Sequence, residues 1–86
     1  MNTQDLLNER GSTHGDFTDN ADIAQRLKAV VYSGKSYQQR TPVEKEAIDM
    51  ILHKIARWVS APKYHADNVI DIAGYAQLVV DRTEQC

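Results

Sequence analysis

The sequence lacks the features that would place it in several common protein classes. The only cysteine is Cys86, the last residue, so no disulfide can form within the chain and a reducing environment fits. No apolar run approaches the roughly 20 residues that a membrane-spanning helix needs. Residues 1–9 lack the basic and apolar regions of a secretory signal. We therefore expect a cytoplasmic protein without a membrane segment.

An excess of positive charge is also absent. The 10 Lys and Arg residues are offset by 12 Asp and Glu residues, which gives a formal net charge of −2. Proteins whose main task is to hold nucleic-acid phosphates carry a basic excess, so we do not expect nucleic acid as a partner. No Walker-type loop, glycine-rich dinucleotide turn or paired-cysteine zinc site occurs either.

Helical periodicity is present along most of the chain. The hydrophobic share of 42% and the charged share of 26% are typical of a globular chain, and 86 residues allow one modest core. Strand-like alternation is absent. We predict an all-α fold, with residues 1–86 forming a single helical domain. It would be a small bundle of three main helices plus a short N-terminal helix, centred on an antiparallel helical hairpin.

The first helix of this hairpin has a clear start and a clear end. Thr41, Pro42 and Glu44 form a capping box with proline in the first turn. Pro62 disfavours helical geometry at the residue before it, so we expect the helix to end near Ser60. Apolar residues at intervals of three and four define the predicted buried stripe: Ile48, Ile51, Leu52, Ile55 and Val59.

The second helix of the hairpin is predicted to begin between His65 and Asn68, with Asp67 as its cap. Its apolar stripe also follows helical spacing: Val69, Ile72, Ala73, Ala76, Val79 and Val80. Gly74 lies in the middle of this helix, where glycine costs about 1 kcal/mol relative to alanine. It therefore needs a reason, such as the close approach of another helix or of a ligand.

Two apolar residues of the same helix, Ile70 and Leu78, fall away from its main stripe. Apolar residues there suggest a second packing surface, and in so small a chain such a surface favours self-association. We therefore predict a homo-oligomer; the alternative is that the two residues are merely exposed.

The first half of the chain contributes a short helix over residues 3–10 and a longer one. The longer helix is predicted from Phe17 to Tyr32 with Asp16 as its cap, and residues 33–40 form a polar loop. The apolar side of the longer helix consists of Phe17, Ala21, Ala24, Leu27, Val30 and Val31.

Carboxylates recur on the charged faces of the hairpin. If the acidic rows of the two helices converge within or between subunits, their oxygens could hold a hard cation such as Mg²⁺. The candidate metal ligands are Glu46, Asp49, Asp67 and Asp71. Two plainer alternatives are a solvated face and ion pairs of Asp67 and Asp71 with Lys54 and Arg57.

Histidine adds a further possibility on the same face. His53 shares the first helix with Glu46 and Asp49, and a histidine–carboxylate cluster can transfer protons or bind metal. The spacing favours the plainer alternative, a satisfied surface histidine. The candidate ligand-binding residues are Arg10, His53, Lys54, Arg57 and Tyr75. No catalytic residue is assigned.

Four segments resemble a family of small, uncharacterised tailed-phage and prophage proteins. They are Arg10-Gly11 with Gly15-Asp16-Phe17, residues 46–51, residues 53–57, and residues 67–76 with the motif Asp-Ile-Ala-Gly-Tyr-Ala. The resemblance covers most of the chain. It implies a phage-type protein in the cytoplasm of a bacterial host cell, and the family brings no settled activity with it.

A fainter resemblance is to the all-helical MazG-like nucleotide pyrophosphohydrolases. These enzymes place acids on two adjacent helices to bind Mg²⁺, and the matching positions here are Glu46 and Asp49 on one helix and Asp67 and Asp71 on the next. The chain departs from that pattern because Lys45 interrupts the usual adjacent glutamate pair. Its second helix also carries its acids four residues apart, not three.

Two functions follow as hypotheses. The first is a non-enzymatic phage accessory protein, a helical oligomer that binds a host or defence component or a small nucleotide. The second is a Mg²⁺-dependent, MazG-like nucleotide pyrophosphohydrolase or a degenerate relative of one. Whether the protein is an enzyme is left open at this point.

Overall fold

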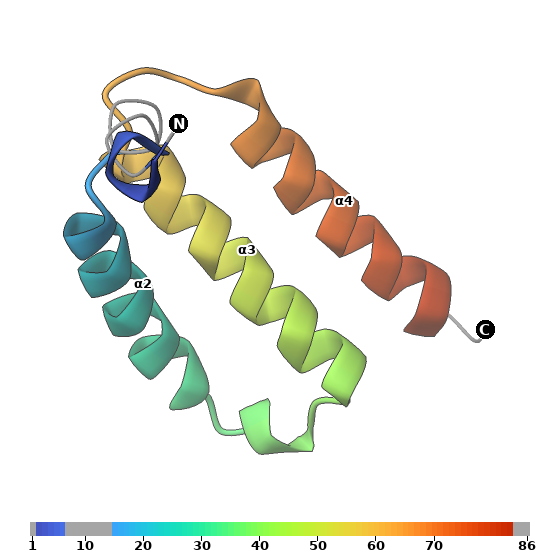
Figure 1. Cartoon of the computed structure of the whole chain (residues 1–86). Helices are drawn as coiled ribbons and strands as arrows, with labels where there is room; N and C mark the ends of the chain where they lie inside the picture. Colours follow the sequence, from blue (N-terminus) through green and yellow to red (C-terminus); the bar gives the residue numbers. More distant parts are fainter. Residues whose placement is uncertain (1, 7–14, 84–86) are drawn as a thin grey trace.

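The computed structural model describes residues 2–6 and 15–83, and every regular element in these ranges is helical. The prediction of an all-α fold is confirmed (Figure 1). Residues 3–6 form a short helical turn. The elements that follow are α2 (Phe17–Tyr32), the 3₁₀ helix η1 (Tyr37–Gln39), α3 (Pro42–Ser60) and α4 (Ala66–Thr83). In the described ranges no helix is both long enough and apolar enough to cross a membrane.

Local sequence signals set the ends of α2 and α3 as predicted. The Asp16 carboxylate accepts a hydrogen bond from the Thr18 N–H and caps α2. At the start of α3 the Thr41 hydroxyl accepts from the Glu44 N–H at 3.1 Å, while the Glu44 carboxylate accepts from the Thr41 N–H at 3.0 Å. This backbone hydrogen bond lowers the pKa of Glu44. The capping box is therefore confirmed, with Pro42 in its first turn.

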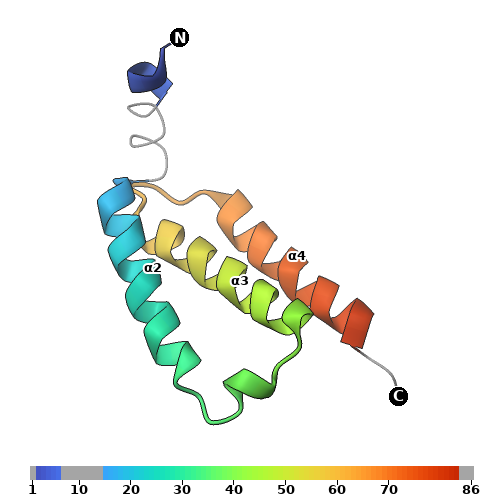
Figure 2. The same cartoon turned by 60° about the horizontal axis from the view of Figure 1, so that its bottom comes forward.

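The start of α4 corrects one prediction. The helix begins at Ala66, so Asp67 lies in its first turn and not at the cap position. A carboxylate in the first turn still faces the positive end of the helix dipole. Only residues 3–6 of the predicted N-terminal helix over residues 3–10 lie in the described ranges. Residues 2–6 are exposed, and Figure 2 shows them beyond the start of α2, away from the three long helices.

The three long helices form a single layer. Helix α3 packs against both α2 and α4, which lie on opposite sides of it (Figures 1 and 2). Chain direction alternates along the layer, so α3 and α4 make the predicted antiparallel hairpin and α2 adds a third helix. A domain normally has at least two packed layers around its core, and the described part of this chain supplies one.

The buried interior is correspondingly small. Among the residues that the structure describes, four apolar side chains are buried: Ala24, Ala47, Leu52 and Ala56. Three of the four are alanines, which allow close approach between helices but bury little surface. Predicted core residues at the ends of the stripes are instead exposed: 78% for Phe17, 72% for Val30 and 62% for Val59.

Helix α4 is rotated relative to its predicted stripe. Asn68 is 1% exposed, and Ile72, Tyr75 and Val79 follow it at helical spacing as half-buried residues. Ala73, Ala76 and Val80, which were predicted to be buried, are exposed. Asn68 is also unusual because neither its amide oxygen nor its amide nitrogen has a hydrogen-bond partner within the described ranges.

The two faces of the layer differ in chemistry. On α3, His53 and Arg57 line a hollow with α2 on one face. On the other face Val59 lines a hollow with Ile23, and the α2 edge of that hollow also carries Asp19 and the Asp22–Arg26 ion pair. We call the face with His53 and Arg57 the charged side. Helical phase assigns aliphatic residues of all three helices to the apolar side: Ile23, Leu27, Val30, Ile48, Ile55, Val59, Ala73, Ala76 and Val80.

Two contacts tie α2 to α3 at opposite ends. At one end the Tyr32 hydroxyl donates a hydrogen bond to the Asp49 carboxylate, and the Tyr32 ring stacks on Tyr37 with centroids 4.7 Å apart. At the other end Gly15 has a φ of +82°, and a Cβ added there would lie 2.5 Å from the Ser60 carbonyl oxygen. Only glycine fits this position, because a side chain would meet backbone.

Candidate functional site: a basic pocket and an adjoining groove

A basic pocket of about 200 Å³ lies between α2 and α3 on the charged side. Eight residues line it: Phe17, Asn20, Ala21, Ala24, Gln25, Lys28, His53 and Arg57. Three of them carry basic side chains, and none of the lining residues in the described part of the chain is a carboxylate. A concave surface with convergent basic groups and no acid is suited to an anion.

Helix geometry brings the basic groups of this pocket together. His53 and Arg57 are four residues apart and therefore share one face of α3. Lys28 comes from the facing side of α2, where the small Ala24 allows the two helices to approach closely. Within the described ranges, the ion pairs are Arg26–Asp22, Arg40–Glu44 and Lys54–Asp71, so Lys28 and Arg57 have no carboxylate partner.

The electrostatics at His53 reflect this environment. Partial burial is the largest cause that lowers the pKa of His53, and the positive charges of Arg57, Lys54 and Lys28 lower it further. Every one of these causes disfavours the protonated ring. A bound anion would act in the opposite direction and favour the imidazolium.

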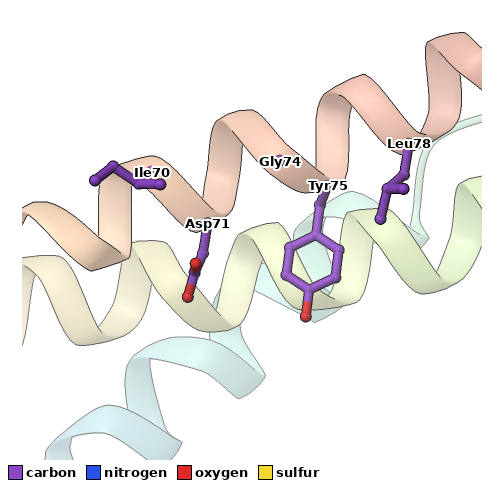
Figure 3. A pocket seen from close by; sticks show the side chains of 5 residues that line it. All are labelled: Ile70, Asp71, Gly74, Tyr75 and Leu78. Atoms are coloured by element: carbon purple, nitrogen blue, oxygen red, sulfur yellow. The ribbon is translucent and has the colours of Figure 1, made fainter.

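An apolar groove runs between α3 and α4. Two hollows form it, one of about 460 Å³ beside α4 and one of about 410 Å³ toward the start of α3, and both include Tyr75 and Leu78. Figure 3 shows Asp71 and Tyr75 extending from α4 toward α3. A Cβ added at Gly74 would meet nothing within 4 Å, so packing within one chain does not require glycine there.

The candidate ligand Lys54 is engaged with a candidate metal ligand. Its ammonium lies 2.8 Å from the Asp71 carboxylate, with side chains 14% and 42% exposed. This is the ion pair that the sequence left as a plain alternative to metal binding. The half-exposed carboxylate limits its contribution to stability, because solvent screens such pairs.

The four candidate metal ligands are not gathered into one cluster. Within residues 2–6 and 15–83, no group of three or more His, Cys, Asp or Glu side chains is placed to hold a metal ion. Asp49 bonds to Tyr32 on the α2 side of α3, whereas Asp71 pairs with Lys54 on the α4 side. Glu46 lines the groove, and Asp67 is exposed in the first turn of α4. A Mg²⁺ site built between two subunits stays a prediction.

The structure divides the predicted ligand-binding residues between two places. His53 and Arg57 line the basic pocket, Tyr75 lines the groove, and Lys54 lies between them in its ion pair. Arg10 lies outside the described residues. Sequence reasoning missed Lys28 and Phe17 as pocket residues. The spacing of Lys28 relative to Ala24 could have placed it on the inner side of α2, whereas nothing in the sequence indicates that Phe17 lies at a pocket.

Comparison with known proteins gives the chain a family. Residues 2–83 match the domain family of unknown function DUF6378, and the chain belongs to that family. No curated protein and no solved structure matches it.

Proposed function

We propose that this member of the DUF6378 family is a non-enzymatic, phage-type accessory protein that binds a small phosphorylated ligand. The observation that carries the proposal is the convergence of Lys28, His53 and Arg57 on one pocket, with no carboxylate among its lining residues in ranges 2–6 and 15–83. Phosphate groups are well matched to such a site, because guanidinium and ammonium groups donate charge-assisted hydrogen bonds to their oxygens. The phage-type assignment rests on the sequence resemblance alone.

Calorimetric titration with ADP and with inorganic pyrophosphate tests the binding. Arg57→Gln should weaken either ligand about 10- to 100-fold, because a hydrogen bond to a charged group contributes about 1.5–3 kcal/mol. Arg26→Gln is the matched control, since Arg26 also lies on the layer but pairs with Asp22 on an exposed surface outside the pocket. Equal affinities in the two variants, or no binding of either ligand by the native protein, would refute the proposal.

We further propose that a second copy of the chain covers the apolar side. A layer of three helices that leaves Val30, Val59 and Val80 at 72%, 62% and 46% exposure lacks the second layer that folded domains normally have. Helix α3 has 19 residues and is therefore about 28 Å long. Three helices at ordinary spacing make a face of roughly 700 Å², which is near the 800 Å² per partner of a stable interface. The basic pocket opens on the other side and would stay accessible.

The alternative function is a Mg²⁺-dependent, MazG-like nucleotide pyrophosphohydrolase, and one observation favours it. Glu46 and Asp71 line the two hollows of the groove, which share Tyr75 and Leu78. Two carboxylates on one groove could become part of a cation site if a second subunit supplied further acids. This function predicts pyrophosphate release from a nucleoside triphosphate with Mg²⁺ or Mn²⁺, abolished by Asp71→Asn. Absence of release with any nucleotide would remove the alternative.

A further inference from the structure

Phe17 is placed where packing does not explain it. It is the first residue of α2, its side chain is 78% exposed, and it nevertheless lines the basic pocket. A single exposed apolar residue is ordinary on a protein surface. An exposed aromatic ring beside three convergent basic groups provides a flat apolar surface next to an anion site.

The size of the pocket limits which part of a ligand it can hold. Its volume of about 200 Å³ is below the roughly 300–1,000 Å³ of pockets that enclose drug-sized molecules. The basic groups can surround one or two phosphoryl groups in that space. Anything attached to them must extend toward the open edge of the pocket, and the exposed Phe17 is a lining residue that can form this edge.

We propose that the ligand is a nucleotide whose phosphates lie among Lys28, His53 and Arg57 and whose base stacks on Phe17. This inference rests on the proposed function, because it assigns a chemical class to the ligand of the same pocket. Every nucleobase has a π-face that can stack on an aromatic side chain, so stacking on the Phe17 ring does not by itself select one base over another. Gln25, the polar uncharged side chain of α2 in the lining, is within the same pocket and could hydrogen-bond the sugar or base.

Titration of the 86-residue chain with ADP, ribose 5-phosphate and pyrophosphate separates stacking from phosphate binding. Phe17→Ala should weaken ADP about tenfold, in line with the effect of removing one base–aromatic stack. The same variant should leave ribose 5-phosphate and pyrophosphate within about twofold of the native protein, because neither contains a base. Phe17→Tyr should restore ADP binding, whereas Phe17→Leu, which keeps an apolar side chain without a ring, should not.

The outcomes distinguish this inference from the function on which it rests. If ADP and pyrophosphate bind but Phe17→Ala changes neither affinity, the base does not use Phe17 and the inference is overturned while the phosphate site stands. If Phe17→Ala weakens pyrophosphate as much as ADP, the residue shapes the pocket and supports no base, and the inference is again overturned. If no ligand binds, both fail. Because Phe17 is exposed, its variants should fold, and unchanged circular dichroism checks this.

Discussion

At the scale of one residue, Asn68 is a polar side chain in a buried position. The side chain is 1% exposed, yet both polar atoms of its amide lack a hydrogen-bond partner in the part of the chain that the structure describes. An unsatisfied buried polar group costs about 1–3 kcal/mol. An apolar stripe read from the sequence could not include this position, because asparagine is most often exposed.

Replacing this amide by a hydrocarbon of similar shape should stabilise the protein. We expect Asn68→Leu to raise the free energy of unfolding by about 1–2 kcal/mol, because it removes the desolvation cost and keeps the branching of the side chain at Cγ. Urea denaturation measures the change. Asn68→Ala is the control, since it removes the amide but leaves a cavity and should gain less. A loss of stability in the leucine variant would mean that the amide has partners after all.

We expect His53 to make the stability of the protein and its affinity for the proposed phosphate ligand depend on pH in opposite directions. Its pKa is lowered in the folded protein, so below about pH 6.5 the unfolded chain binds more protons at this residue than the folded chain does. The free energy of unfolding should therefore fall as the pH drops through and below 6.5. The contribution of His53 to affinity for the proposed phosphate ligand should rise over the same window, because the protonated ring attracts the anion. Comparison with His53→Gln separates this contribution from protonation of the phosphate itself at about pH 6.

Comparison with His53→Gln isolates this contribution from the other two histidines of the chain. The difference in unfolding free energy between the native protein and the variant should become less favourable to the native protein as the pH falls from 7.5 to 5. A difference that does not change with pH would contradict the direction of the pKa shift.

At the scale of the element, the ends of the helices could be predicted from the sequence because capping residues act within their own turn. The cap residues Asp16 and Thr41 and the proline at position 42 act on their own turns, so the limits of α2 and α3 follow from sequence. Which side of a helix is buried depends on its neighbours. Helix α3 has neighbours on opposite sides, so its buried residues Ala47 and Leu52 do not belong to one stripe. The rotation of α4 and the position of Phe17 at a pocket could not be predicted from the sequence, because both depend on how neighbouring helices pack.

Replacing Gly74 by alanine tests whether another helix or a ligand approaches α4 at this position. Because an added Cβ meets nothing within 4 Å, Gly74→Ala should stabilise the isolated chain by about 1 kcal/mol through helix propensity. Thermal denaturation at low protein concentration measures this effect. A destabilised variant would show that a neighbouring helix or a ligand approaches Gly74 closely in solution.

At the scale of the whole molecule, the single layer predicts where association occurs. Val59→Lys places a charge on the apolar side and should convert the proposed dimer into monomers, because burying an unpaired ammonium is costly. Ile70→Lys is the matched control, since Ile70 is β-branched and 65% exposed, close to the 62% of Val59, but lies off the apolar side. Analytical ultracentrifugation distinguishes the two results. Dissociation by Ile70→Lys alone would assign the interface to Ile70 and Leu78, as the sequence first suggested.

The contact between Gly15 and the Ser60 carbonyl has a consequence for Phe17, two residues further along the chain. Any side chain at position 15 would clash with the Ser60 carbonyl and push the first turn of α2 away from the end of α3. The ring would then turn away from Arg57 although no residue of the pocket had been exchanged. A random mutagenesis screen for loss of the proposed nucleotide binding should therefore recover substitutions at position 15, although Gly15 does not line the basic pocket.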